Sequence, residues 1–321
     1  MLKKKEVKYN NEISELCTFS LGGYQQKVLM EGKSKDNPIV ITLHGGPGTP
    51  IPFSVGCRGL FPELTNEFLM VYWDQLGCGI NNHMIDDSFT IDMFVQMALE
   101  LIEKVKAKFP NNKIMIFSTS WGSILSAKLL EKNPHAVDGV IAYGQIIKTV
   151  FFCNEVTDTL AQTNIPKKKL EKIKNMAADN FTRKDLQLIS SALHKYTDAY
   201  QNRNGEKLPM GTIIKSLLTS PDYSMKDFKA IMVNGYMKNT SLWKEITQIN
   251  LSNQLRNVEV PYIIFQGDTD IVASTKLVKE LVASSNNANL SCRILENTGH
   301  IPSVEMMDTL LAVLQEVSQL L

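Results

Sequence analysis

The sequence lacks the features that mark several large classes of protein. Its 321 residues include 34 basic and 33 acidic side chains, which gives a net charge of +1. Proteins that bind nucleic acid usually carry a clear basic excess, so this balance argues against such a partner. No run of 18 uncharged apolar residues occurs, and we expect neither a membrane-spanning helix nor a membrane partner.

Cysteine is scarce and scattered. The five cysteines form no Cys-x-x-Cys pair and stand at Cys17, Cys57, Cys78, Cys153 and Cys292. Such a set is typical of reduced thiols, and we expect a cytoplasmic protein. The basic N-terminal segment is not followed by an apolar stretch, so a secretory signal is not expected.

What the chain does have is an alternation of short apolar runs and helical patterns, with 44% hydrophobic residues, enough for a large core. Continuous apolar runs such as 39–43 suit strands covered on both faces of a parallel sheet. We expect strands at 13–19, 24–30, 39–43, 68–73, 113–117, 137–143, 262–265 and 290–295. We expect helices at 88–108, 121–133, 275–284 and 306–321. This alternation predicts a doubly wound α/β fold.

The middle of the chain differs from both flanks. It is richer in lysine and polar residues, shows helical periods such as 166–178, and has no clear strand. We therefore expect a first part of an α/β core at 1–145, an inserted helical cap at 146–250, and a second part of the core at 251–321.

The stretch FSTSWGS, residues 117–123, places Ser120 between a predicted strand and a predicted helix. A strand, a sharp turn carrying a serine and a helix make up the nucleophile elbow of serine hydrolases. The usual spelling is Gly-x-Ser-x-Gly, and Ser118 stands here at the first glycine. A serine in such a turn can also be an ordinary helix N-cap.

Two further polar residues follow predicted strands, Asp270 in Gly267-Asp268-Thr269-Asp270 and His300 in Gly299-His300. The carboxyl ends of parallel strands meet at the edge of the sheet where ligands bind. Histidine can take the proton of a serine, and a carboxylate can orient the histidine. The order Ser120, Asp270, His300 therefore predicts a catalytic triad, with Asp268 as the competing carboxylate.

Acyl transfer also needs donors for the negative charge that develops on the carbonyl oxygen. The N–H of Trp121, directly after Ser120, is one candidate. The other is the N–H of Gly45 or Gly46 in the His44–Gly48 loop, HGGPG, which follows the predicted strand at 39–43. Glycine lets a backbone approach a substrate closely.

These motifs resemble those of the α/β-hydrolase superfamily, and within it the proline iminopeptidase-like serine hydrolases. The resemblance rests on HGGPG at 44–48, WDQLGCG at 73–79, SWGS at 120–123, Gly267-x-x-Asp270 and Gly299-His300. It covers about 20–145 and 255–310. It implies an α/β-hydrolase fold with a mostly parallel sheet, a helical cap over the active site, and neither a metal nor an organic cofactor.

The sequence departs from the family pattern at several positions. Leu76 replaces an arginine, Asn81 a serine and Ser118 a glycine. The family's cap glutamates, which hold a substrate's free amino end, have no clear counterpart. Glu155 and Glu245 remain as candidate substrate-binding residues.

Three functions are open at this point. The first is a serine hydrolase that cleaves an ester or amide of a small to medium substrate through an acyl-enzyme. The second is a proline iminopeptidase-type aminopeptidase acting on short peptides. The third is a non-catalytic ligand-binding relative, which would require a broken triad. The oligomeric state is not visible in the sequence.

Overall fold

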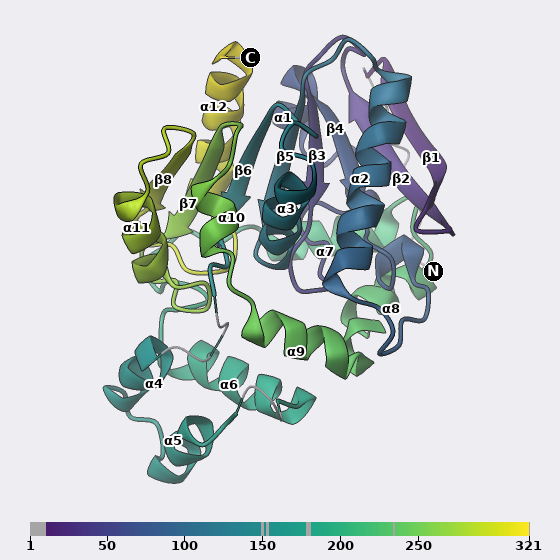
Figure 1. Ribbon diagram of the computed structural model, residues 1–321. Coiled ribbons are helices and arrows are strands. Elements are labelled where there is room, and N and C mark those ends of the chain that lie inside the picture. Colours follow the sequence, from purple (N-terminus) through teal and green to yellow (C-terminus); the bar gives the residue numbers. More distant parts are fainter. Residues whose placement is uncertain (1–10, 149–150, 152–153, 178–180, 234, 321) are drawn as a thin grey trace.

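The computed structural model of the chain describes residues 11–148, 151, 154–177, 181–233 and 235–320. It is built around one sheet of eight strands in the order β1-β2-β4-β3-β5-β6-β7-β8 (Figure 1). The strands are β1 Ile13–Leu21, β2 Tyr24–Gly32, β3 Ile39–Leu43, β4 Leu69–Trp73, β5 Ile114–Thr119, β6 Gly139–Tyr143, β7 Tyr262–Gly267 and β8 Leu290–Leu295. All eight expected strands are present, with small shifts at their ends.

The sheet is mostly parallel, as the apolar runs predict. Strands β1 and β2 form the expected hairpin, and β2 pairs antiparallel with β4. Every pair from β4 to β8 is parallel. All residues of β3, β4 and β6 are buried, because helices cover the sheet on both faces.

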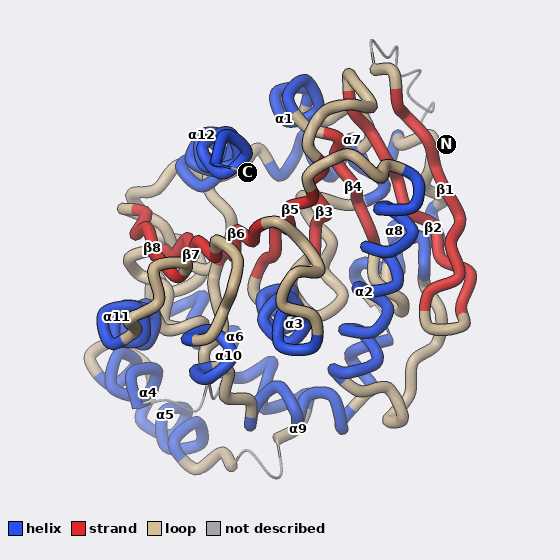
Figure 2. The backbone as a smooth tube through the Cα atoms, turned by 45° about the horizontal axis from the view of Figure 1, so that its top comes forward, coloured by secondary structure: helices blue, strands red, loops and turns tan. Residues whose placement is uncertain are grey.

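Helices pack on both sides of the sheet (Figure 2). Helices α2, α3, α10 and α11 lie on one face, and α1 and α12 lie on the other. Their bounds are α1 Pro62–Glu67, α2 Ile91–Lys108, α3 Trp121–Lys132, α10 Ser252–Arg256, α11 Thr275–Ser284 and α12 Val304–Leu320. Helix α2 begins later than the expected Ser88, because the Thr90 side chain caps it by accepting the N–H of Met93. Two short 3-10 turns, η1 Val55–Cys57 and η2 Gly79–Asn81, lie in the core loops.

The chain between β6 and β7 is helical wherever the structure describes a regular element from Asn154 to Gln248. Its elements are α4 Asn154–Ala161, α5 Lys167–Lys174, α6 Arg183–Tyr196, α7 Met210–Thr219, α8 Met225–Met232, η4 Gly235–Lys238 and α9 Thr240–Gln248. Helix α5 lies within the helix expected at 166–178 but ends at Lys174. Residue 178 lies outside the described chain. The N–H of Leu251 donates to the carbonyl of Ile147 over 2.7 Å. The two ends of this segment, the insertion (residues 146–250), therefore lie side by side.

The insertion is fastened to the core by buried polar contacts. Arg58, in the loop after β3, makes two hydrogen bonds of 2.6 Å to Asp222, which precedes α8. Both side chains are more than nine-tenths buried. Tyr223, the next residue, donates its hydroxyl to the carboxylate of Asp74 after β4. No helix in the described residues is long and apolar enough to cross a bilayer.

Candidate active site

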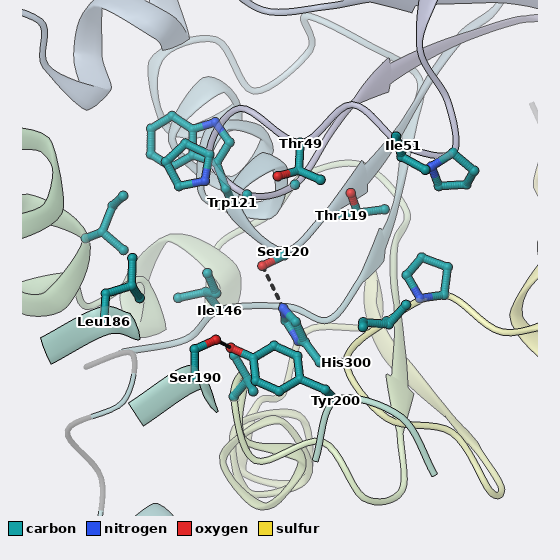
Figure 3. Close-up of a pocket in the computed structure, with 18 of the residues that line it drawn as sticks. Thr49, Ile51, Thr119, Ser120, Trp121, Ile146, Leu186, Ser190, Tyr200 and His300 are labelled. Atoms are coloured by element: carbon teal, nitrogen blue, oxygen red, sulfur yellow. Dashed lines mark hydrogen bonds between the residues drawn. The ribbon is translucent and has the colours of Figure 1, made fainter. Parts of the chain in front are cut away.

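Ser120 lies at the turn between β5 and α3, where the backbone is strained. Its φ is 48° and its ψ is −112°, a conformation that costs a non-glycine residue on the order of 1–3 kcal/mol. Helix α3 also passes close to the end of β3, since a Cβ on Gly122 would lie 2.0 Å from the carbonyl oxygen of Leu43. The Ser120 side chain makes no N-cap hydrogen bond to α3. It faces the cavity instead (Figure 3).

Three of the expected site residues are joined by hydrogen bonds. Nε2 of His300 lies 2.8 Å from Oγ of Ser120, and Nδ1 lies 2.8 Å from Oδ2 of Asp270. With the proton of the neutral ring on Nδ1, facing the carboxylate, Nε2 is free to accept the serine proton. Asp268, the competing carboxylate, instead accepts the N–H of Thr298 over 3.0 Å.

The Asp270 carboxylate is held from several directions and is fully buried. Its Oδ1 accepts the N–H groups of Val272 and Ala273 at 2.8 and 2.9 Å. Its Oδ2 accepts the side-chain amide of Gln266 at 3.1 Å in addition to His300. These bonds fix the carboxylate in the plane that His300 needs.

The loop that carries His300 is held by both the core and the insertion. The hydroxyl of Tyr143, at the end of β6, lies 2.5 Å from the carbonyl oxygen of Gly299 and 3.1 Å from that of Ile301. The N–H of His300 donates to the carbonyl of Ala199, in the insertion, over 2.8 Å. The position of the imidazole thus depends on residues from distant parts of the chain.

Tyr200 extends this contact to the imidazole ring. Its ring lies edge-on to that of His300, with the centroids 6.0 Å apart. Its carbonyl accepts the N–H of Ile301 over 2.8 Å, and its hydroxyl pairs with Ser190 at 2.7 Å. On its other side, Tyr200 stacks on His194 with 4.1 Å between the ring centroids.

The loop after β3 brings its glycine backbone beside the serine. A Cβ on Gly45 would lie 3.4 Å from Cβ of Ser120. Gly46 has a φ of +115°, which L side chains rarely adopt. Trp121 is the first residue of α3, so its N–H has no partner within the helix. The candidate donors Gly45, Gly46 and Trp121 therefore all line the cavity around Ser120.

The side chain of Gln75 contacts both Trp121 and the loop that carries Gly45. Its Oε1 accepts the indole N–H of Trp121 over 2.7 Å, and its Nε2 donates to the carbonyl of His44 over 3.4 Å. Its own N–H donates to Nε2 of His44 over 2.9 Å. The His44 proton therefore sits on Nδ1 and is donated to the carbonyl of Gly45 at 2.9 Å. Burial lowers the pKa of His44 to about 4, which keeps it neutral.

Asp74 braces the loops behind the site. It accepts the N–H groups of Val55 and Ile80, each over 3.0 Å, and the hydroxyl of Tyr223. Burial raises the pKa of Asp74 to about 6, because these three donors only partly replace the lost water. Asp74 is thus a support for the loops and lies outside the cavity lining.

A cavity of about 450 Å³ opens beside Ser120 and His300. It is lined by core loops on one side and by the insertion on the other. Figure 3 shows Leu186 and Ile146 of the insertion on one side of Ser120, and Thr49, Ile51 and Thr119 of the core on the other. Among the described residues, no group of three or more His, Cys, Asp or Glu side chains could hold a metal ion. A nucleophile, a base and an apolar cavity together suit acyl transfer.

The profile of the α/β hydrolase fold matches residues 38–305 of the chain. The chain belongs to the α/β hydrolase family. Its membership of this family and its similarity to aminopeptidases show that the protein is a hydrolase. A probable aminopeptidase of Bacillus subtilis, YbaC, is 22% identical over 307 residues, which cover 91% of this chain and 92% of that protein. A proline iminopeptidase of Neisseria gonorrhoeae is 35% identical over 126 residues, or 38% of this chain and 36% of that protein.

Solved structures share the whole fold at low sequence identity. The crystal structure of VinJ superposes with a TM-score of 0.64 at 18% identity, and covers 96% of this chain and 99% of that one. A proline iminopeptidase of Mycobacterium smegmatis gives a TM-score of 0.63 at 17% identity, and covers 95% and 98%. At this identity, the likeness shows the α/β hydrolase fold alone.

This α/β hydrolase accommodates its departures from the family motifs in different ways. Ser118 is fully buried, and its hydroxyl pairs with that of Ser126 on α3 at 3.0 Å. Leu76 joins the hydrophobic core. Asn81 ties the loop to β2 by exchanging two hydrogen bonds with the backbone of Lys27, at 2.7 and 2.8 Å.

The two candidate glutamates of this α/β hydrolase lie outside the cavity lining. Glu155, on α4, accepts the hydroxyl of Ser274 at the start of α11. Glu245, on α9, accepts the N–H of Ile91 over 3.2 Å. Trp243, two residues earlier on α9, does line the cavity. Residues two apart on a helix point about 200° apart, so Glu245 faces the other way.

Sequence reasoning missed Gln266, Ala199 and Tyr200, and it gave Gln75 no role of its own. Gln75 stands inside the quoted WDQLGCG motif, so a signal was present there. Gln266 acts through a buried amide, Ala199 through a backbone carbonyl, and Tyr200 through a carbonyl and a ring contact. The local pattern of residues indicates none of these contacts.

Proposed function

We propose that this hydrolase cleaves ester or amide bonds by way of an acyl-enzyme. The proposal is carried by one observation: His300 places one ring nitrogen 2.8 Å from Oγ of Ser120 and the other 2.8 Å from Oδ2 of Asp270. Ser120 is the nucleophile, His300 the general base and acid, and Asp270 the orienting carboxylate.

In the first half-reaction, Oγ of Ser120 attacks the substrate carbonyl carbon while Nε2 of His300 takes the hydroxyl proton. The imidazolium formed is stabilised by Asp270. It returns the proton to the leaving alcohol or amine as the bond to the acyl carbon breaks. In the second half-reaction, water attacks the acyl-enzyme by the same route, which releases the acid and restores Ser120.

The charge that develops on the carbonyl oxygen needs donors fixed in advance. We assign this role to the N–H of Trp121 and to that of Gly45 or Gly46. Gly45 is supported by its closeness to Cβ of Ser120, and Trp121 by its free helix-terminal N–H. Loss of one such donor typically lowers turnover on the order of 10²- to 10³-fold.

A second candidate function is release of N-terminal residues from short peptides. It is favoured by the relatives named as a probable aminopeptidase and as proline iminopeptidases. It uses the same three residues and differs in what the cavity must accept. Acetylating the amino end of a substrate should then abolish its cleavage.

The test compares p-nitrophenyl butyrate and proline p-nitroanilide as substrates of the wild type and of Ser120→Ala. We expect Ser120→Ala to lower kcat on the order of 10⁶-fold, as removal of a nucleophile does. Ser118→Ala is the matched control, because Ser118 lies two residues away and outside the cavity. Unchanged turnover of both substrates by Ser120→Ala would refute the proposal.

A further inference from the structure

The cavity beside Ser120 is apolar on nearly every side. Its lining from the insertion is aliphatic or aromatic apart from one pair of hydroxyls, Ser190 and Tyr200, which bond to each other at 2.7 Å. The apolar wall includes Ile51, Ile146, Leu186, Leu208, Val272 and Ile301. Surface of this kind favours hydrocarbon and offers little to an ion.

Within the described part of the chain, no Asp, Glu, Lys or Arg side chain lines this cavity. The nearby carboxylates are engaged elsewhere. Asp270 lies behind His300 and is fully buried, with four donors around it. Glu155 bonds to Ser274, and Glu245 bonds to the backbone of Ile91. Among the described lining residues, a cation in the acyl site would meet hydroxyls, the His300 imidazole and hydrocarbon, and no carboxylate.

We propose that the acyl site selects an uncharged, apolar acyl group and discriminates against one that carries a free α-ammonium. This rests on the proposed function and names its substrate class as esters or amides of unsubstituted aliphatic or alicyclic acids. The preference would separate this chain from relatives that are named for an aminopeptidase activity.

The physical reason is desolvation. An aminoacyl substrate must bring its α-ammonium within a few bonds of the carbon that Ser120 attacks, and so into the cavity. An ammonium that leaves water without a charged partner is strongly disfavoured. A hydrogen or a methylene at the same place avoids this cost, and each additional buried CH₂ contributes a factor of about four in binding.

The test uses pairs of p-nitroanilides that differ only at this position. L-norleucine p-nitroanilide is compared with hexanoyl p-nitroanilide, and L-proline p-nitroanilide with cyclopentanecarbonyl p-nitroanilide. We expect kcat/KM to be at least about 100-fold higher for the neutral member of each pair near pH 6. The difference should narrow as the pH rises through the α-amino pKa of about 7.7–8.0. Equal rates, or faster cleavage of the amino compounds, would overturn the proposal.

A substitution in the cavity wall tests the cause directly. Leu186 lies on α6 and is only partly buried, so a polar residue is tolerable there for folding. Leu186→Glu should raise kcat/KM for the amino substrate relative to kcat/KM for the neutral substrate by about tenfold or more, because the carboxylate attracts the ammonium. Leu186→Gln, which has the same shape without the charge, should not. An equal change of this kcat/KM ratio in both variants would contradict the proposed cause, because polarity without charge would then suffice.

Labelling by a fluorophosphonate separates failure of this inference from failure of the proposed function. No labelling of the folded wild type would refute the acyl-enzyme itself, and with it the acyl site. Labelling that is lost in Ser120→Ala, combined with a preference for amino substrates, would leave the function standing and refute only the selection of neutral acyl groups.

Discussion

The side-chain amide of Gln266 donates a hydrogen bond to Oδ2 of Asp270 over 3.1 Å, and the same oxygen pairs with Nδ1 of His300. Its orientation is fixed from the other end, because Oε1 of Gln266 accepts the backbone N–H of Gln145 over 3.1 Å. A backbone N–H can only donate, so the NH₂ group must face Asp270. Gln266 is thus a positioning residue for the carboxylate.

We expect Gln266→Leu to lower kcat by about 10- to 100-fold, since a hydrogen bond to a charged group contributes about 1.5–3 kcal/mol. KM should change little, because Gln266 is fully buried and outside the cavity lining. With one donor fewer, Oδ2 of Asp270 should bind the His300 proton more tightly. The acidic limb of the kcat/KM profile should therefore move to higher pH, measured with p-nitrophenyl butyrate from about pH 5 to about pH 9. An unshifted limb would mean that Gln266 is only structural.

Ser118 stands at the far end of the same buried set of hydrogen bonds. Its hydroxyl meets that of Ser126 at 3.0 Å, Ser126 meets Tyr262 at 3.0 Å, and Tyr262 donates to Gln145 at 2.6 Å. We expect Ser118→Ala to lower the free energy of unfolding by about 1 kcal/mol, measured by urea denaturation, and to leave kcat and the pH profile unchanged. A shifted pH profile in this variant would show that the polar chain transmits changes to Asp270.

Gln75 holds the indole of Trp121 and the carbonyl that precedes Gly45. We expect Gln75→Leu to lower kcat about 10- to 100-fold, because both backbone donors lose their support. Binding of a trifluoromethyl ketone, whose adduct carries the oxyanion, should weaken by a similar factor while KM for the ester stays nearly constant. Trp121→Phe, which removes only the indole N–H, should give part of this loss. Full ketone affinity in Gln75→Leu would count against the assignment.

Asp74 should make a stability contribution that depends on pH. Burial raises its pKa from 3.8 to about 6 in the folded state. The native state therefore holds the proton more tightly than the unfolded chain. This contribution is complete below about pH 4, is lost as the pH rises through about 6, and amounts to about 3 kcal/mol.

Asp74→Asn provides the reference for this measurement, because it removes the titration and keeps the size of the side chain. The free energy of unfolding of the wild type minus that of the variant should fall by about 3 kcal/mol between about pH 4 and pH 7. A difference that stays constant over this range would contradict the raised pKa. At neutral pH, Asn still places an NH₂ group where Asp74 accepts from Ile80 or Val55, so the variant should not gain stability outright.

The sheet and the order of the site residues could be predicted because they depend on local pattern. Continuous apolar runs such as 39–43 mark strands covered on both faces, and the chain order Ser120, Asp270, His300 follows from where strands end. The hydrophobic face of a helix also shows in the sequence. What it packs against does not, so the arrangement of α4 to α9 was beyond prediction.

The contacts that position the site were hidden for a related reason. Gln266 lies inside a buried strand, where a polar residue gives no sign of its partner. Ala199 contributes only a carbonyl, which every residue has. Glu155 and Glu245 were selected as acidic residues of the insertion, yet each one binds a neighbour outside the cavity. Only the three-dimensional structure distinguishes residues that contact the site from residues of the same type that do not.

The main-chain bonds from His300 to Ala199 and from Ile301 to Tyr200 have a consequence for protein engineering. A graft that replaced residues 146–250 with a foreign set of helices would also remove two carbonyls that hold the loop of His300, the proposed general base. Such a chimaera should lose turnover on every substrate, whatever new specificity it carried. A graft that retains residues 198–201 would keep His300 in place. In this chain, a change of specificity must therefore leave the backbone of Ala199 and Tyr200 where it is.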